Sequence, residues 1–139
     1  MPSIVKNKDV ETCLRNLLLE KNYKLSEEKG FGELGTDIIA EKNDEKLHIE
    51  VIGYKEPGHA RAKDYFEVFF RTISMLNDKT SIKVVMALPK KFRNGLPRRA
   101  MHYKVAWSRI GKIFPELEIW LIDIENEKYQ RTLWNDWLD

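Results

Sequence analysis

Two carboxylates, Asp37 and Glu50, have the setting in this chain that most suggests chemistry. Asp37 opens one predicted strand, and Glu50 lies within the next, where it alternates with Leu47, Ile49 and Val51. Because successive side chains of a strand point to opposite faces, Glu50 lies on the face opposite these three core residues. A carboxylate there is solvated on an open face, paired, or coordinated to a cation. We expect both carboxylates to project into one cleft, because same-face residues of neighbouring strands lie close together.

Histidine and cysteine give weaker signals. None of His48, His59 and His102 has a partner at i+4 that would suggest a helical zinc site, so we interpret them as surface or structural residues. The single cysteine, Cys13, cannot form an internal disulfide or a multi-thiolate zinc site. It lies on the apolar stripe of a predicted helix, which favours an inert core thiol over a nucleophile.

A glycine-rich segment matches the dinucleotide-binding spacing. Gly30, Gly32 and Gly35 have the G-x-G-x-x-G pattern, which binds pyrophosphate only when it opens a helix. Here a strand follows, and Glu33 and Asp37 would repel a phosphate group. We therefore interpret the glycines as a loop between strands.

Hydrophobic periodicity predicts the elements that position these residues. Apolar residues at helical spacing predict a helix over 9–22, a second that begins just after Pro57-Gly58 and continues to residue 76, and a third that opens at Pro97. Strand patterns cover 23–29, 37–42, 46–54, 82–88 and 118–124. The order α-β-β-β-α-β-α-β predicts an α/β sandwich with a mixed central sheet, which covers both faces of the two most apolar strands.

Length and composition predict one globular domain over residues 1–139. Hydrophobic residues make up 42% and charged residues 33% of the sequence, which is neither a disordered nor a fibrous composition. The longest apolar runs are far shorter than the roughly 20 residues that cross a bilayer, and the N-terminus has no signal-peptide pattern. We therefore expect no membrane association and a cytoplasmic location.

Positive charge is concentrated in the middle of the chain. Residues 79–115 carry ten Lys and Arg and no Asp or Glu, whereas both flanking segments have an acidic excess and the net charge is only +2. This basic block attracts polyanions if its side chains converge, and nucleic acid is the commonest polyanion. The alternative is a solvated surface with acidic side chains from elsewhere alongside. The members that we expect to contact nucleic acid are Lys90, Lys91, Arg93, Arg98, Arg99, Lys104 and Arg109.

From the first predicted helix to the second, residues 9–76, the chain resembles the PD-(D/E)XK nuclease superfamily, which includes archaeal Holliday-junction resolvases. The resemblance rests on the order of the elements, on the segment GTDIIA at 35–40 and on the segment LHIEVIG at 47–53. It implies a restriction-endonuclease-like three-layer sandwich. It also implies that Asp37 and Glu50 bind Mg²⁺ or Mn²⁺, and that the protein hydrolyses phosphodiester bonds of DNA or RNA.

The sequence departs from the superfamily at the lysine that helps to activate water. That lysine is expected two residues beyond the Glu, where this chain has Ile52. Lys55 would return to the Glu50 side only if Gly53 formed a one-residue bulge. Lys63, at the start of the next helix, is the other candidate and the one we favour, although Glu67 at i+4 offers it an ordinary surface ion pair.

A third acidic residue is implied by the resolvase-like members, which carry a Glu in the first helix. That position corresponds to Glu11, a further candidate metal ligand, and Glu20 at the opposite edge of the apolar stripe is a weaker one.

Three functions follow from these observations. The first is a metal-dependent nuclease whose basic block follows the phosphate backbone, with DNA as the first expected partner and a homodimer left open. The second is a catalytically silent relative that binds nucleic acid or a protein partner. The third is a small interaction domain in which Tyr129, Trp134 and Trp137 dock a partner. For these aromatic residues we favour a final helix that packs on the chain's own core.

Overall fold

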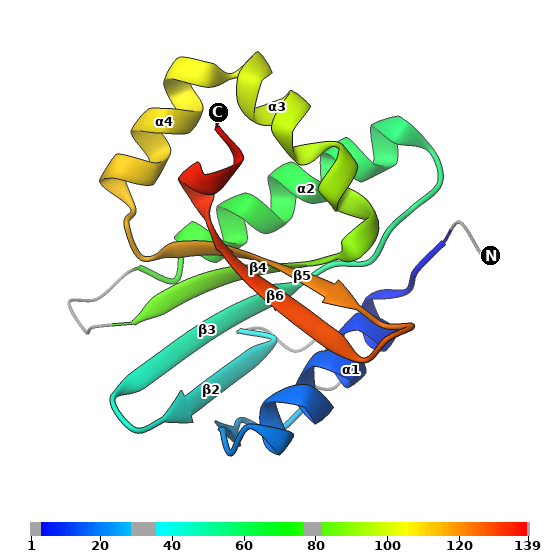
Figure 1. Cartoon of the computed structure of the whole chain (residues 1–139), viewed down its shortest axis with the longest axis vertical. Helices are drawn as coiled ribbons and strands as arrows, with labels where there is room; N and C mark the ends of the chain where they lie inside the picture. The colour runs from blue at the N-terminus through cyan, green and yellow to red at the C-terminus, as the bar shows by residue number, and fades with distance from the viewer. Residues whose placement is uncertain (1–3, 29–35, 77–81, 139) are drawn as a thin grey trace.

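A computed structural model describes residues 4–28, 36–76 and 82–138 (Figure 1). Its sheet has six strands in the spatial order β1-β2-β3-β4-β5-β6. The first three pair antiparallel, β3, β4 and β5 pair parallel, and β6 is antiparallel to β5. The elements are α1 (Asn7–Glu20), β1 (Lys24–Leu25), β2 (Ile38–Lys42), β3 (Glu45–Val51), α2 (Gly58–Ile73), β4 (Lys83–Pro89), η1 (Lys90–Asn94), α3 (Leu96–His102), α4 (Lys104–Ile113), β5 (Leu117–Asp123), β6 (Lys128–Leu133) and η2 (Trp134–Trp137).

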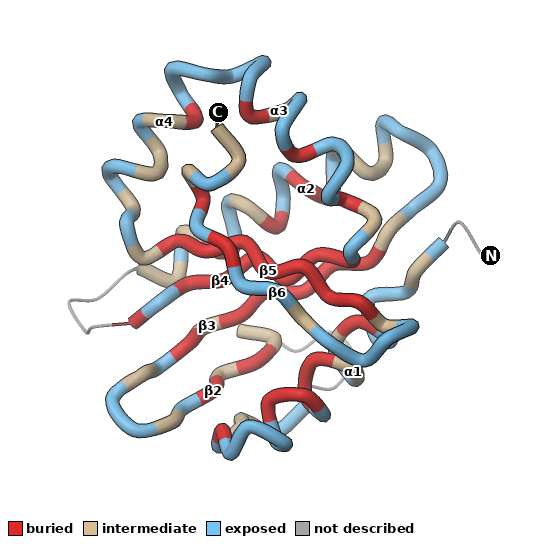
Figure 2. The backbone as a smooth tube through the Cα atoms, in the orientation of Figure 1, coloured by how far each residue is buried: buried red, intermediate tan, exposed pale blue. Residues whose placement is uncertain are grey.

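Helices cover both faces of this sheet. Helix α1 packs on one face, while α2, α3 and α4 lie on the other (Figure 1). Val85 and Ala87 of β4 belong to the core under α1, and Val84 and Met86 belong to the core under α2. Figure 2 shows the consequence as buried backbone along the middle strands. The prediction of an α/β fold with a mixed central sheet is confirmed, and the two buried faces explain why β4 has an almost continuous apolar run.

The β2–β3 hairpin fixes the register of the two candidate metal ligands. Its two-residue turn is Asn43-Asp44, with Asn43 at a φ of 53°, a left-handed conformation that Asn tolerates. Ile38 pairs with Ile49. Asp37, one residue before Ile38, is therefore next to Glu50, one residue after Ile49.

The region after β4 differs from the prediction in two ways. The third helix is interrupted at Tyr103, whose φ of −107° and ψ of 29° separate α3 from α4. A sixth strand, β6, follows β5 at the edge of the sheet and is absent from the prediction. Of its six residues only Thr132 is buried, so the strand has no apolar alternation by which to recognise it.

The C-terminal aromatic residues pack on the chain itself: Trp134 and Trp137 lie in a 3-10 turn rather than a full helix, and Tyr129 lies on β6. Trp134 stacks on Trp107 with ring centroids 3.9 Å apart, and each indole N–H donates to the other residue's backbone carbonyl. Tyr129 stacks on Trp120, and the indole N–H of Trp137 donates to the hydroxyl of Thr132. These contacts support the interpretation that the rings pack on the chain's own core and do not form a docking surface.

No helix among the described residues combines the length and apolar character that a membrane crossing requires. The glycine-rich segment 30–35 lies outside the described residues.

Candidate metal site

Asp37 and Glu50 meet where β2 begins and β3 approaches its end. The backbone N–H of Asp37 donates to Oε2 of Glu50 at 3.0 Å, and the backbone N–H of Val51 donates to Oδ2 of Asp37 at 2.9 Å. Glu50 is buried, with 3% of its surface exposed, and Asp37 is half-buried. The hairpin therefore brings the two carboxylates together, and each is oriented by a backbone donor of the opposite strand.

Arg71, from the last turn of α2, places a cation beside this pair. Its Nε lies 3.2 Å from Oε1 of Glu50, and its Nη1 lies 3.6 Å from Glu67. Arg71 was not selected from the sequence. Lys63, Glu67 and Arg71 occupy one face of the helix at i, i+4 and i+8, and this spacing is the signal that points to it. Because α2 returns over the sheet, the residue two turns beyond Lys63 is the one that reaches Glu50.

Neither candidate lysine contacts the carboxylates in the described parts of the chain. Lys55 pairs with Asp64 at 3.1 Å. Lys63 is exposed, and the surface ion pair expected with Glu67 is made by Arg71 instead.

The strand also lacks the bulge that would redirect Lys55. Val51 packs in the core under α1 and Ile52 in the core under α2, which is regular alternation. Gly53 then passes close to the N-terminal segment: a Cβ at this position would lie 2.0 Å from the carbonyl oxygen of Val5. Tyr54 pairs with Val5 as an isolated bridge, so Gly53 permits a close backbone approach and not a bulge.

Glu11 is held by an arginine of its own helix. Arg15, 8% exposed, places Nε 2.7 Å from Oε2 of Glu11, and its Nη2 donates to the backbone carbonyl of Asp37 at 2.9 Å. Arg15 also donates to the carbonyl of Ser26. Glu11 is thus connected to the Asp37 segment through Arg15. Among the described residues, no three His, Cys, Asp or Glu side chains form a group that could hold a metal ion.

His48 is a further residue on the Glu50 side of β3. It lies two residues before Glu50, half-buried, with Nδ1 3.4 Å from Oγ1 of Thr36. From the sequence we interpret it as a surface or structural residue. Its period-2 relation to Glu50 is the signal that places both side chains on one face.

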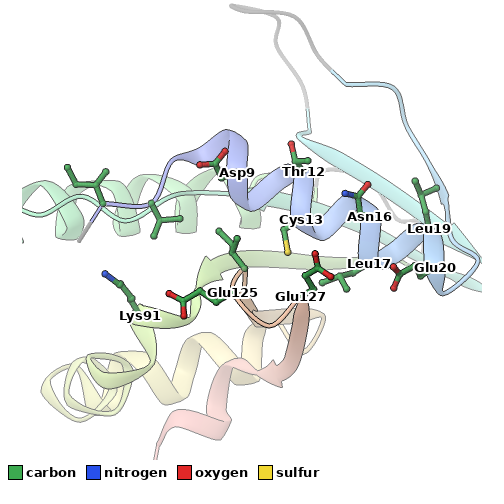
Figure 3. Close-up of a pocket in the computed structure, with 13 residues that line it drawn as sticks. Asp9, Thr12, Cys13, Asn16, Leu17, Leu19, Glu20, Lys91, Glu125 and Glu127 are labelled. Atoms are coloured by element: carbon green, nitrogen blue, oxygen red, sulfur yellow. The ribbon is translucent and has the colours of Figure 1, made fainter. Parts of the chain in front are cut away.

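A separate cavity of about 720 Å³ lies between α1 and the β5–β6 turn (Figure 3). Glu20, Glu125 and Glu127 line it together with Cys13. Burial raises the pKa of the Cys13 thiol, and the nearby Glu127 and Asp123 carboxylates raise it further. The thiol is at the margin of the core and not inside it, but its raised pKa agrees with the interpretation that it is unreactive. Glu20 is exposed on α1 and does not join Asp37 and Glu50.

The seven basic residues expected to contact nucleic acid divide into three groups in space. Lys90 pairs with Asp123 at 3.4 Å, and Arg93 donates to the side-chain carbonyl of Gln130. Lys104 and Arg109 are exposed on α4. The members that converge on one cavity are Lys91, Arg98 and Arg99, joined there by Arg61 from α2.

Comparisons with protein-family models, curated proteins and solved structures gave no match to this chain.

Proposed function

We propose that this protein is a metal-dependent nuclease of the restriction-endonuclease-like fold that hydrolyses phosphodiester bonds of DNA or RNA. The observation that carries the proposal is the cross-strand pair of Asp37 and Glu50, oriented by backbone donors from each other's strands. The succession α1, β1, β2, β3, α2 and β4, with an antiparallel meander followed by a parallel crossover, supports the same assignment.

The donor set fits Mg²⁺ or Mn²⁺. Both ions prefer oxygen ligands, and Mg²⁺ is commonly bound by one or two carboxylates together with water and substrate phosphates. Asp37 and Glu50 supply two carboxylates, held in position by the backbone N–H groups of Val51 and Asp37. The positively charged guanidinium of Arg71 lies beside Oε1 of Glu50, so a metal ion would compete with it for this oxygen.

The chain's own residues have distinct roles in this proposal. A bound divalent ion would lower the pKa of water and offset the charge that develops on the phosphate. Asp37 and Glu50 orient that ion. Arg71, 45% exposed, can donate hydrogen bonds from its in-plane N–H groups to phosphate oxygens. It thereby replaces the lysine of the superfamily, which is absent here because residue 52 is Ile. His48, on the same face of β3, offers an imidazole that can accept or return a proton.

A cleavage assay tests the proposal. Wild type, Asp37→Asn, Glu50→Gln and Glu67→Gln are incubated with single-stranded, duplex and branched DNA and RNA, with Mg²⁺, Mn²⁺ or EDTA. We expect cleavage by wild type only with a divalent ion, and its loss in Asp37→Asn and Glu50→Gln. Glu67→Gln is the matched control, because this exposed carboxylate also contacts Arg71 and should remain active. EDTA-resistant cleavage, or full activity of both site variants, would refute the assignment.

The second candidate is a catalytically silent protein of the same fold that binds nucleic acid. One observation favours it: Arg71 already forms an ion pair with Glu50. An ion pair whose function is purely structural would neutralise Glu50 in the same way. The two candidates differ in one respect. The silent protein would retain nucleic acid at low salt and cleave no substrate with any divalent ion.

A further inference from the structure

A cavity of about 540 Å³ opens beyond the carboxyl ends of β3 and β4, between the start of α2 and the η1–α3 segment. Neither Asp37 nor Glu50 lines it. Its charged lining residues are all basic, and no Asp or Glu is among them; they are Arg61, Lys91, Arg98 and Arg99. A pocket with this charge favours an anionic ligand, and its size matches a site for one small organic group.

Two aromatic rings are exposed in the same cavity. Phe66 of α2 is 46% exposed and Tyr103, between α3 and α4, is 44% exposed. Their ring centroids lie 6.2 Å apart with planes at 82°. Large aromatic side chains at this exposure offer apolar surface to a ligand, and beside cationic groups they suit a ligand with a flat ring as well as a negative charge.

Arg99 and Arg61 pack on aromatic rings, and Arg61 also donates to the backbone carbonyls of Lys55 and Glu56. The guanidinium carbon of Arg99 lies 4.3 Å from the ring centroid of Tyr65, and that of Arg61 lies 4.8 Å from the ring centroid of Tyr54. Stacking uses the face of a guanidinium, whereas its N–H donors lie in the plane. In the described parts of the chain, neither arginine forms an ion pair with a carboxylate, and neither does Arg98.

We propose that this cavity binds one unpaired nucleotide of a single-stranded nucleic acid. The base stacks on Phe66 or Tyr103, and its phosphate accepts hydrogen bonds from Arg98 and Arg99. A paired base in a duplex has its faces covered by neighbouring bases, so only an unpaired base can use the rings. The inference deepens the proposed nuclease function and rests on it for the polymer being nucleic acid.

Fluorescence anisotropy in EDTA tests this proposal without cleavage. The probes are a labelled single-stranded oligonucleotide, a blunt duplex with the same number of phosphates, and a single strand with abasic sites. We expect the single strand to bind about tenfold or more tightly than the other two. Tyr103→Ala and Phe66→Ala should each weaken single-strand binding at least about fivefold, and Tyr103→Phe should restore it.

Matched variants separate stacking and local charge from general attraction. Arg98→Ala removes an exposed charge inside the cavity, and Lys104→Ala removes an exposed charge on α4 outside it. We expect the larger loss of affinity from Arg98→Ala. Val105→Ala, at a residue 71% exposed on α4, should change nothing. Equal binding of the three probes, or unchanged affinity in the two aromatic alanine variants, would overturn the proposal.

The binding test is separable from the nuclease proposal. Binding in EDTA and cleavage with a divalent ion are measured separately on the wild-type protein, because neither Asp37 nor Glu50 lines the cavity. Normal single-strand preference without any cleavage would refute hydrolysis and support the nucleotide pocket. Cleavage without that preference would do the reverse.

Discussion

Asp37 and Glu50 lie beside each other across β2 and β3, and the backbone N–H of Asp37 donates directly to the Glu50 carboxylate at 3.0 Å. The pair therefore depends on the register of one hairpin, in which Ile38 faces Ile49. A slip of one residue would turn one carboxylate into the core under α1. The same register that buries the apolar residues of β3 also builds the candidate metal site.

Arg71 provides the first prediction. If its guanidinium both neutralises Glu50 and contacts the phosphate, Arg71→Ala should bind Mn²⁺ more tightly while it cleaves about 10² to 10³ times more slowly. Arg71→Lys should recover part of the rate, because a cation remains. Single-turnover cleavage and a Mn²⁺ titration measure the two effects. An unchanged cleavage rate in Arg71→Ala would remove Arg71 from the mechanism.

Cys13 provides the second prediction. Burial and the Glu127 carboxylate raise its thiol pKa, so the reactive thiolate is scarce at neutral pH. Glu127→Gln should lower this pKa and accelerate alkylation of Cys13 at pH 8. Glu125→Gln is the control, because Glu125 lines the same cavity but is not among the causes of the shift. Alkylation quenched at a series of times and followed by mass spectrometry gives the alkylation rates. Equal rates in both variants would contradict the electrostatic explanation.

Glu45 provides the third prediction, which concerns how the free energy of unfolding depends on pH. Hydrogen bonds from Arg131 lower the pKa of Glu45 from 4.5 to about 2. The folded-state pKa is therefore below the unfolded-state value. Its stabilisation is fully present above pH 4.5 and is lost as pH falls towards 2. Glu45→Gln should reduce the free energy of unfolding at pH 7 by on the order of 2 kcal/mol, and should flatten its decline in acid.

Urea unfolding at several pH values measures this effect. Glu41→Gln is the matched control, since its exposed pair with Lys46 at 3.6 Å should contribute little. A Glu45→Gln protein whose stability declines in acid as steeply as that of wild type would be inconsistent with the lowered pKa.

The Trp107–Trp134 stack provides the fourth prediction. Trp134 is 3% exposed, and its side chain joins the C-terminal turn to α4. Trp134→Ala should reduce the free energy of unfolding by about 3 to 5 kcal/mol, the usual cost of removing a large buried aromatic. Leu133→Ala, at a residue 53% exposed, should change stability little. Equal effects of the two substitutions in urea titrations would argue against packing by this stack.

Elements with a strong hydrophobic period could be predicted from the sequence. The apolar run of β4 is explained by burial on both faces. The apolar spacing of α2 predicts the helix but not its buried face, because Phe66 and Phe70 are exposed while Tyr65 and Val68 are buried. The pairing of Asp37 with Glu50 was also predictable, because a short turn restricts the hairpin to few registers. These features depend on local spacing, which a sequence displays directly.

Features set by long-range geometry were not predictable. Strand β6 is an exposed edge strand, so burial leaves no alternation in it. Arg71 reaches Glu50 because α2 lies over the sheet against β3, and Arg61 lines the same cavity as Arg98 because the start of α2 lies beside the η1–α3 segment. The helical spacing of Arg71 showed its face but not its partner. The spacing of residues along the chain does not show which residue on another element they contact.

Binding of Mn²⁺ to the protein alone tests whether Asp37 and Glu50 form a metal site, because it does not depend on choosing the right nucleic acid. Electron paramagnetic resonance of free Mn²⁺ gives the number of ions bound by wild type and by Asp37→Asn. We expect a bound ion in wild type that Mg²⁺ displaces, and we expect its binding to be lost or much weakened in Asp37→Asn. No bound ion in wild type, or the same binding in both proteins, would contradict it.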